Sequence, residues 1–118
     1  MGTKNQEFIR AFNEAFARED VDYLIENVSE DVVWTMAGTP PIKGKSAFAE
    51  ELKKMKSGEA WELEIHHIIT HGDTAAVDGT IKKADKQGKT YAFCDIYRLS
   101  AFKNGKVKEL TSYVVEVR

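Results

Sequence analysis

The stretch that most constrains the fold runs from Lys89 to Val117, where two strand-like segments flank a single turn signal. That signal is Asn104-Gly105, a pair that suits a two-residue type I′ turn between antiparallel strands. If these two residues form the loop, the register of the hairpin follows from it. The expected cross-strand pairs are Asp95 with Val114, Tyr97 with Ser112, Leu99 with Leu110 and Phe102 with Val107.

Side chains alternate across a sheet, so this hairpin has two faces, and both are too apolar to be left in water. One face carries Phe93, Asp95, Tyr97, Leu99, Leu110, Ser112 and Val114. The other carries Cys94, Ile96, Arg98, Phe102, Val107, Glu109, Thr111, Tyr113, Val115 and Val117. If helices cover the first face, a second copy of the chain is the simplest cover for the second. We therefore expect a homodimer formed through the outer face of the sheet.

Asp95 is a single carboxylate in the middle of the face that the helices should cover. Its neighbours Phe93 and Tyr97 would remove water from it, and desolvation raises the pKa of an acid. Buried acids without a partner tend to mark functional sites, although a structural hydrogen bond explains such a residue equally well. Arg98 lies on the opposite face, where a diagonal pair with Glu109 is expected.

The rest of the chain reads as helices followed by strands, which predicts an α+β domain with a mainly antiparallel sheet rather than a parallel α/β sheet. Thr3 and Gln6 form a capping-box pattern at the first helix, and Asp20 can cap the second. The expected elements are a helix to about Arg18, a short helix after Asp20 broken by Ser29-Glu30-Asp31, a strand at 32–36, a loop at 38–44, a helix at about 46–56, and a four-strand meander with turns at 71–73, 85–88 and 104–105.

Composition excludes several classes of function. A net charge of −2 and a pI near 5.9 give no reason to expect nucleic acid or an anionic membrane as partner. The chain has no apolar run long enough to span a membrane and no visible secretory signal, so we expect one cytoplasmic domain covering residues 1–118. The single cysteine, Cys94, excludes an internal disulfide, has no readable base beside it, and is expected to be a small core residue.

Two further patterns do not amount to binding motifs. The segment from Gly38 to Ser46 has five residues between its glycines where a P-loop has four, and two of the five are prolines without an N–H group. His66 and His67 are adjacent, so in a regular strand they point to opposite faces and cannot chelate one metal. We expect no metal and no other cofactor.

Several segments together resemble the nuclear transport factor 2-like superfamily, in its SnoaL-like and ketosteroid-isomerase-like branch. They are the amphipathic N-terminal helix, REDVDYLIENVSEDVVW, GTPPIKGKSAFAEEL and CDIYRLSAFKNGKVKELTSYVV, which cover nearly the whole chain. The resemblance implies a strongly curved sheet wrapped around three helices as a cone, with an apolar pocket at its mouth. It also implies that two cones commonly pair through their sheets.

The resemblance carries over only in part. Asp95 falls where the isomerases have the pocket acid that binds the substrate oxygen, and where SnoaL-type cyclases have an acid/base Asp. Met36 stands in place of the isomerases' general base and Phe12 in place of their tyrosine. A methionine cannot abstract a proton and a phenylalanine cannot donate one, which argues against ketosteroid isomerase activity proper.

Two hypotheses remain open from the sequence. The first is an isomerase, cyclase or lyase without metal, acting on a small apolar oxygenated molecule, with Asp95 as proton shuttle and Tyr97 or Ser112 assisting. The expected pocket wall comprises Phe8, Phe12, Phe16, Trp34, Met36, Phe93, Ser112 and Val114. The second is a ligand-binding or structural dimer module that has the fold without the chemistry, because fold does not determine function.

Overall fold

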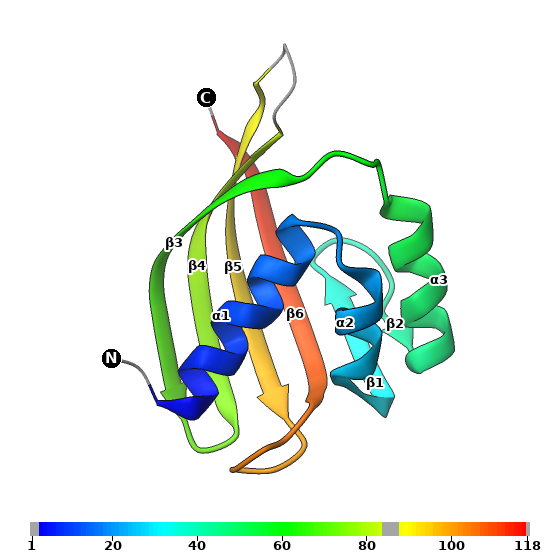
Figure 1. Ribbon diagram of the computed structural model, residues 1–118, viewed down its shortest axis with the longest axis vertical. Helices are drawn as coiled ribbons and strands as arrows, with labels where there is room; N and C mark the ends of the chain where they lie inside the picture. Colours follow the sequence, from blue (N-terminus) through cyan, green and yellow to red (C-terminus); the bar gives the residue numbers. More distant parts are fainter. Residues whose placement is uncertain (1–2, 84–87, 118) are drawn as a thin grey trace.

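The computed structural model describes residues 3–83 and 88–117, and in them three helices pack on one face of a curved six-stranded sheet (Figure 1). The elements are α1 (Lys4–Ala17), α2 (Val21–Glu26), β1 (Val28–Met36), β2 (Ile42–Lys43), α3 (Lys45–Met55), β3 (Trp61–His71), β4 (Thr74–Lys83), β5 (Thr90–Leu99) and β6 (Val107–Val117). The strand order is β2-β1-β6-β5-β4-β3, with only β1 and β6 parallel among these neighbours. The predicted α+β class with a mainly antiparallel sheet is confirmed.

The helix starts follow from local capping. At α1 the Thr3 hydroxyl accepts a hydrogen bond from the Gln6 amide at 3.1 Å, and the Gln6 side chain accepts one from the Thr3 amide at 2.9 Å. Asp20 caps α2 by accepting from the Tyr23 amide at 3.2 Å. Both caps were predicted, because capping depends on residues three apart in the chain. None of the described helices is long and apolar enough to cross a membrane.

Two predictions for the middle of the chain are wrong in detail. The first strand begins at Val28 rather than at residue 32, because Ser29-Glu30-Asp31 lie within β1 at a register irregularity and do not end the preceding segment. The predicted loop at 38–44 contains β2, which pairs with β1 through Trp34 and Ile42. The predicted turn at 85–88 includes residues 85–87, which lie outside the described residues.

The register of the β5–β6 hairpin differs from the prediction by two residues: Asp95 pairs with Ser112, and Tyr97 with Leu110. The connection is the longer segment 100–106, closed by hydrogen bonds from the Ser100 amide to the Lys106 carbonyl (2.8 Å) and from the Lys106 amide to the Ser100 hydroxyl (2.9 Å). A shift of two residues leaves each β6 side chain on its predicted face, whereas a shift of one would have reversed them.

Val107 is the exception, because it was assigned to the outer face and is fully buried in the core. Arg98 pairs with Glu109 but Leu99 pairs with Val107, so Lys108 is an extra residue that resets the alternation. Phe102, also assigned to the outer face, lies in the exposed connection beside Gly72. Arg98 makes its ion pair with Asp73 at 3.5 Å rather than with Glu109.

A second bulge bends the sheet between β3 and β4, where the register shifts between Ile65 and His67. Gly79 pairs with Ile65 there, and a Cβ atom at Gly79 would lie 2.0 Å from the Glu64 carbonyl oxygen, so only glycine fits. The bulge also leaves His66 and His67 both exposed, with Glu64 and Asp78 as their respective partners. The strict alternation expected of a regular strand therefore does not hold at these two histidines.

The core lies between α1 and the concave face of the sheet. Phe12, fully buried, contacts Tyr97 edge-on with ring centroids 5.8 Å apart and Phe16 at 5.5 Å. On the convex face Tyr113 and Val115 remain 50% and 64% exposed. Cys94 is half-buried on this outer face rather than in the core, because it alternates with Asp95.

Candidate functional site

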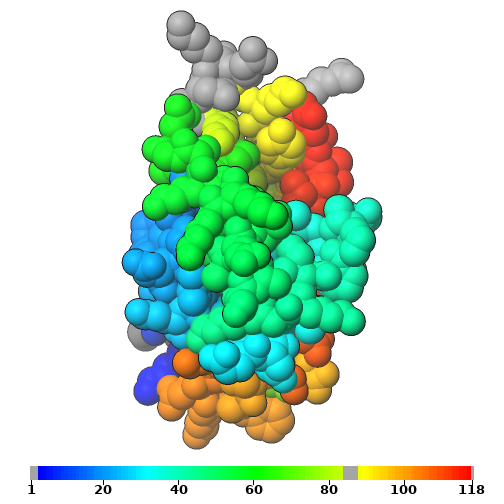
Figure 2. Space-filling model, turned by 90° about the vertical axis from the view of Figure 1, so that its right-hand side faces the viewer, coloured from blue at the N-terminus to red at the C-terminus, as the bar shows by residue number. Residues whose placement is uncertain are grey.

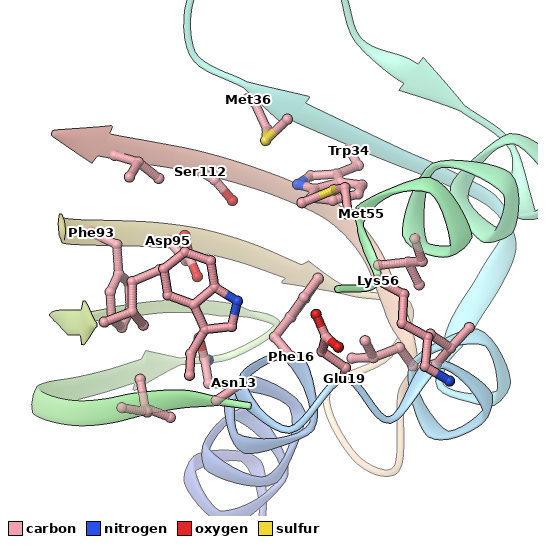
Figure 3. Close-up of a pocket in the computed structure, with 18 residues that line it drawn as sticks. Asn13, Phe16, Glu19, Trp34, Met36, Met55, Lys56, Phe93, Asp95 and Ser112 are labelled. Carbon is pink, nitrogen blue, oxygen red and sulfur yellow. The ribbon is translucent and has the colours of Figure 1, made fainter. Parts of the chain in front are cut away.

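A cavity of about 200 Å³ lies between the helices and the concave face of the sheet (Figure 3). On the side of the molecule away from β3, α3 and the segment that runs from α3 to β3 form the surface (Figure 2). The wall is largely apolar, with a few polar groups among the lining residues. Those residues are Asn13, Phe16, Ala17, Glu19, Val21, Leu24, Trp34, Met36, Leu52, Met55, Lys56, Trp61, Leu63, Ile81, Phe93, Asp95, Ser112 and Val114.

Asp95 lies on the inner face of β5 and is only 8% exposed. Burial raises its pKa to about 7, and a hydrogen bond with Ser112, its cross-strand partner, lowers the pKa only in part. No ion pair to Asp95 is found in the described part of the chain. A carboxyl group in this state is present in both protonation forms near neutral pH, so it can give or take a proton.

Trp34 lies on β1 with its indole held between Phe16 and Phe48, at centroid distances of 5.7 and 5.4 Å. The side chain is 3% exposed, and its Nε1 atom has no hydrogen-bond partner among the described residues. In Figure 3 this nitrogen points into the cavity, on the side where Ser112 lies. The wall therefore presents a fixed hydrogen-bond donor as well as an acid.

Asn13 is a buried cavity residue that the sequence reasoning missed. Its side-chain nitrogen donates to the Ile9 carbonyl at 3.0 Å, one turn earlier in α1. The available signal was an amide within the apolar stripe of this helix, between Phe12 and Phe16.

Glu19 and Lys56 border the cavity where the α1–α2 turn meets the end of α3. Glu19 has a left-handed backbone (φ 59°), and its carboxylate accepts hydrogen bonds of 2.9 Å from the Ser57 amide, the Ser57 hydroxyl and the Gly58 amide. Partial burial raises the pKa of Glu19, but these hydrogen bonds outweigh that effect and hold the pKa below its ordinary value. The carboxylate thus fastens the segment after α3 to the α1–α2 turn.

The predicted site residues divide into two groups. Those that line the cavity are Phe16, Trp34, Met36, Phe93, Asp95, Ser112 and Val114. Phe8, Phe12 and Tyr97 lie outside its lining, with Phe12 and Tyr97 packed in the core and Phe8 half-buried against it. Burial, together with the charge of Asp95, raises the pKa of Tyr97 well above its usual range. Its hydroxyl lies near Asn13 but makes no hydrogen bond of ordinary geometry with the described residues.

The remaining lining residues lie on α1, on the turn after it, on α2, on and just after α3, and on strands β3 and β4. The sequence prediction did not bring these elements to the cavity. Among the residues that the structure describes, no group of three or more His, Cys, Asp or Glu side chains could hold a metal ion.

Comparison with known protein families matches residues 9–110 to the SnoaL-like domain. The chain belongs to the SnoaL-like domain family. Comparison with curated proteins gives no match. Solved structures show that this SnoaL-like domain has the nuclear transport factor 2-like fold, as the sequence resemblance implied.

Three of these structures illustrate the fold likeness. An NTF2-like protein of unknown function from Cytophaga hutchinsonii has a TM-score of 0.72 and 24% identity, covering 97% of this chain and 100% of the other. An epoxide hydrolase from M. tuberculosis resembling LEH has a TM-score of 0.75 and 21% identity, covering 91% and 79%. A protein from Kribbella flavida with a provisional assignment as a ketosteroid isomerase has a TM-score of 0.78 and 15% identity, covering 96% and 78%.

Proposed function

We propose that this SnoaL-like domain binds a small, largely apolar oxygenated molecule in the cavity and transfers a proton on it through Asp95. The observation that carries the proposal is a carboxyl group 8% exposed, without an ion-pair partner among the described residues, in the wall of an apolar cavity. With a pKa of about 7, Asp95 can act as base and then as acid in one reaction cycle. Isomerisation and cyclisation of carbonyl compounds are reactions of this kind.

The size of the cavity limits the ligand. A cavity of roughly 150 Å³ is known to hold benzene, and pockets for drug-sized ligands span roughly 300–1,000 Å³. A volume of about 200 Å³ therefore suits a ligand whose buried part is one ring or a short bicyclic skeleton. This volume, with Met36 and Phe12 where a base and a tyrosine would be needed, argues against a steroid substrate.

Epoxide opening by water, suggested by the hydrolase among the structural neighbours, fits the cavity less well. That reaction needs a base for the water and an acid for the epoxide oxygen at the same moment. Of the two carboxylates in the cavity lining, Glu19 is already held by Ser57 and Gly58, which leaves Asp95 alone for proton transfer.

The test is hydrogen–deuterium exchange at the carbon next to a carbonyl group, followed by NMR in D₂O with a panel of one- and two-ring ketones. The protein should accelerate the exchange, and Asp95→Asn should reduce that acceleration by about 10²-fold or more, the usual contribution of a positioned base. Asp22→Asn makes the same chemical change on the exposed surface of α2 and should leave the exchange rate unaltered. Equal rates for the protein and for Asp95→Asn would contradict the proposal.

A non-catalytic ligand-binding module is the second candidate, favoured by the position of Tyr97 outside the cavity lining, which leaves Ser112 as the one predicted helper of Asp95 in the wall. Ketone binding without any exchange at the neighbouring carbon would support this alternative.

For either function we propose a homodimer through the convex sheet face, whose Tyr113 and Val115 are at least half exposed.

A further inference from the structure

The indole of Trp34 contributes a polar group to the cavity that the proton-transfer proposal does not use. Trp Nε1 is a hydrogen-bond donor and cannot act as an acceptor. At Trp34 this donor is buried and has no partner among the described residues, although buried polar groups are nearly always paired. Leaving such a donor unpaired costs about 1–3 kcal/mol, so its position calls for an explanation.

The packing of the ring makes the direction of this N–H group a fixed property of the site. Phe16 contacts the indole from α1 and Phe48 contacts it from α3, both within 6 Å between centroids. Rotating the ring away would disrupt both contacts. The donor is therefore held toward the cavity before any ligand arrives, as Figure 3 shows.

Trp34 and Asp95 reach the cavity from strands on either side of β6, because β1 and β5 both pair with that strand. Two inter-strand spacings, about 10 Å, separate β1 from β5, and Asp95 lies a further two residues along the sheet, because Trp34 pairs with Leu110 and Asp95 pairs with Ser112. Ser112 lies on β6 beside Asp95, two residues beyond Leu110, which is the β6 partner of Trp34. The donor and the acid therefore belong to separate parts of the same cavity wall.

We propose that Trp34 is a specificity-determining residue whose Nε1–H group donates a hydrogen bond to a carbonyl oxygen of the ligand. This deepens the proposed function, on which it rests, by defining the ligand class as compact cyclic ketones held by that oxygen. A molecule of the same shape without an acceptor leaves the donor unpaired and binds more weakly.

The test compares cyclohexanone with methylenecyclohexane, in which a CH₂ group replaces the carbonyl oxygen at nearly the same shape. Binding is measured by NMR, following the indole N–H resonances of ¹⁵N-labelled protein. The chain has two tryptophans, Trp34 and Trp61, and a Trp61→Phe variant assigns the two signals. Cyclohexanone should move the Trp34 N–H resonance downfield, and methylenecyclohexane should not.

The matched variants are Trp34→Phe and Trp61→Phe, because both indoles line the cavity. Trp34→Phe should weaken cyclohexanone binding about threefold to tenfold, the effect of losing one neutral hydrogen bond, without a comparable loss for methylenecyclohexane. Trp61→Phe also alters the cavity wall, so it should change the affinities for both probes by a similar factor and leave their ratio unaltered. If Trp34→Phe does not fold, the resonance shift in the unmodified protein decides the question.

Three outcomes would overturn the assignment. They are equal affinity for the two probes, a Trp34 resonance that neither probe moves, and loss of ketone preference in Trp61→Phe instead of Trp34→Phe. An unmoved resonance would mean that no ligand oxygen reaches the donor. Because binding and not turnover is measured, ketone preference through Trp34 can be established even if Asp95 proves inactive in the exchange assay. Conversely, exchange that depends on Asp95 without any ketone preference would refute only the role of Trp34.

Discussion

Replacing Asp95 by asparagine should stabilise the protein, and the gain should depend on pH. The folded protein holds the Asp95 proton with a pKa of about 7, against an ordinary value of 3.8, because burial disfavours the charged form. The folded state therefore binds this proton more tightly than the unfolded chain does. The stabilising contribution of the bound proton is complete below about pH 3.8 and is lost as the pH rises to about 7.

The size of the effect follows from the difference between the two pKa values. At about 1.4 kcal/mol per pKa unit, the rise from 3.8 to about 7 means that ionised Asp95 lowers the free energy of unfolding by about 4 kcal/mol above pH 7. Asparagine has nearly the same shape and never ionises, but it must still satisfy a buried amide beside Ser112. We expect Asp95→Asn to raise the free energy of unfolding by about 2–4 kcal/mol at pH 8, and by less than about 1 kcal/mol at pH 4.

Urea denaturation of both proteins at several pH values between 4 and 8 measures this difference directly. Asp22→Asn, an exposed site on α2, controls for the loss of one negative charge. A carboxyl NMR titration of the unmodified protein gives the folded pKa independently. A gain that is constant across the pH range, or a titration at or below the ordinary value, would refute the desolvation argument and leave Asp95 a structural acid held by donors.

Three shorter predictions concern other parts of the molecule. Sedimentation at micromolar concentration should give about twice 13.3 kDa, and Val115→Lys on the convex face should give a monomer; a monomeric unmodified protein would refute the dimer. Glu19→Ala removes three hydrogen bonds, so it should lower the free energy of unfolding by about 1–3 kcal/mol and speed hydrogen exchange of the Ser57 amide. An unchanged exchange rate would show that other contacts hold the segment after α3. Tyr97→Phe should change the free energy of unfolding by less than about 1 kcal/mol, because the hydroxyl it removes makes no ordinary hydrogen bond; a larger loss would place a partner there.

Features that depend on near neighbours in the chain were predictable from the sequence. The caps at Thr3 and Asp20 follow from residue types a few positions apart. The burial of Asp95 on the helix-facing side followed from alternation along one strand. Predicting these features requires no knowledge of which elements pack together.

The hairpin register shows where local rules give way to tertiary contacts. Asn104 does adopt the left-handed conformation that its turn signal implies, with φ of 55°. The connection nevertheless closes earlier, between Ser100 and Lys106, while the Leu99 amide donates to the Asp73 carbonyl of the neighbouring turn. The bulge at Lys108 then turns Val107 into the core. No pattern within the hairpin itself specifies these contacts.

The predicted residues that line the cavity lie on β1, β5 and β6, apart from Phe16 on α1. Asp95, Ser112, Phe93 and Val114 follow from one another by alternation, and all four line the cavity. The wall also includes Asn13, Glu19 and residues of α3. These residues reach the cavity because of the angle at which the helices pack, and no local pattern within one helix specifies that angle. Phe12 shows the opposite error, since an apolar stripe does not reveal which of its members faces core and which faces cavity.

The departures from ordinary packing in this chain are concentrated around the cavity. Asp95 is a buried acid without an ion-pair partner in the described residues, and the Trp34 N–H group is buried without a hydrogen-bond partner there. Glu19 adds a strained backbone at the mouth. Each of these features opposes folding, and a core selected for stability alone would replace them with apolar side chains. Natural proteins violate local rules chiefly at functional sites, so their clustering around one cavity supports a binding function there independently of the family to which the chain belongs.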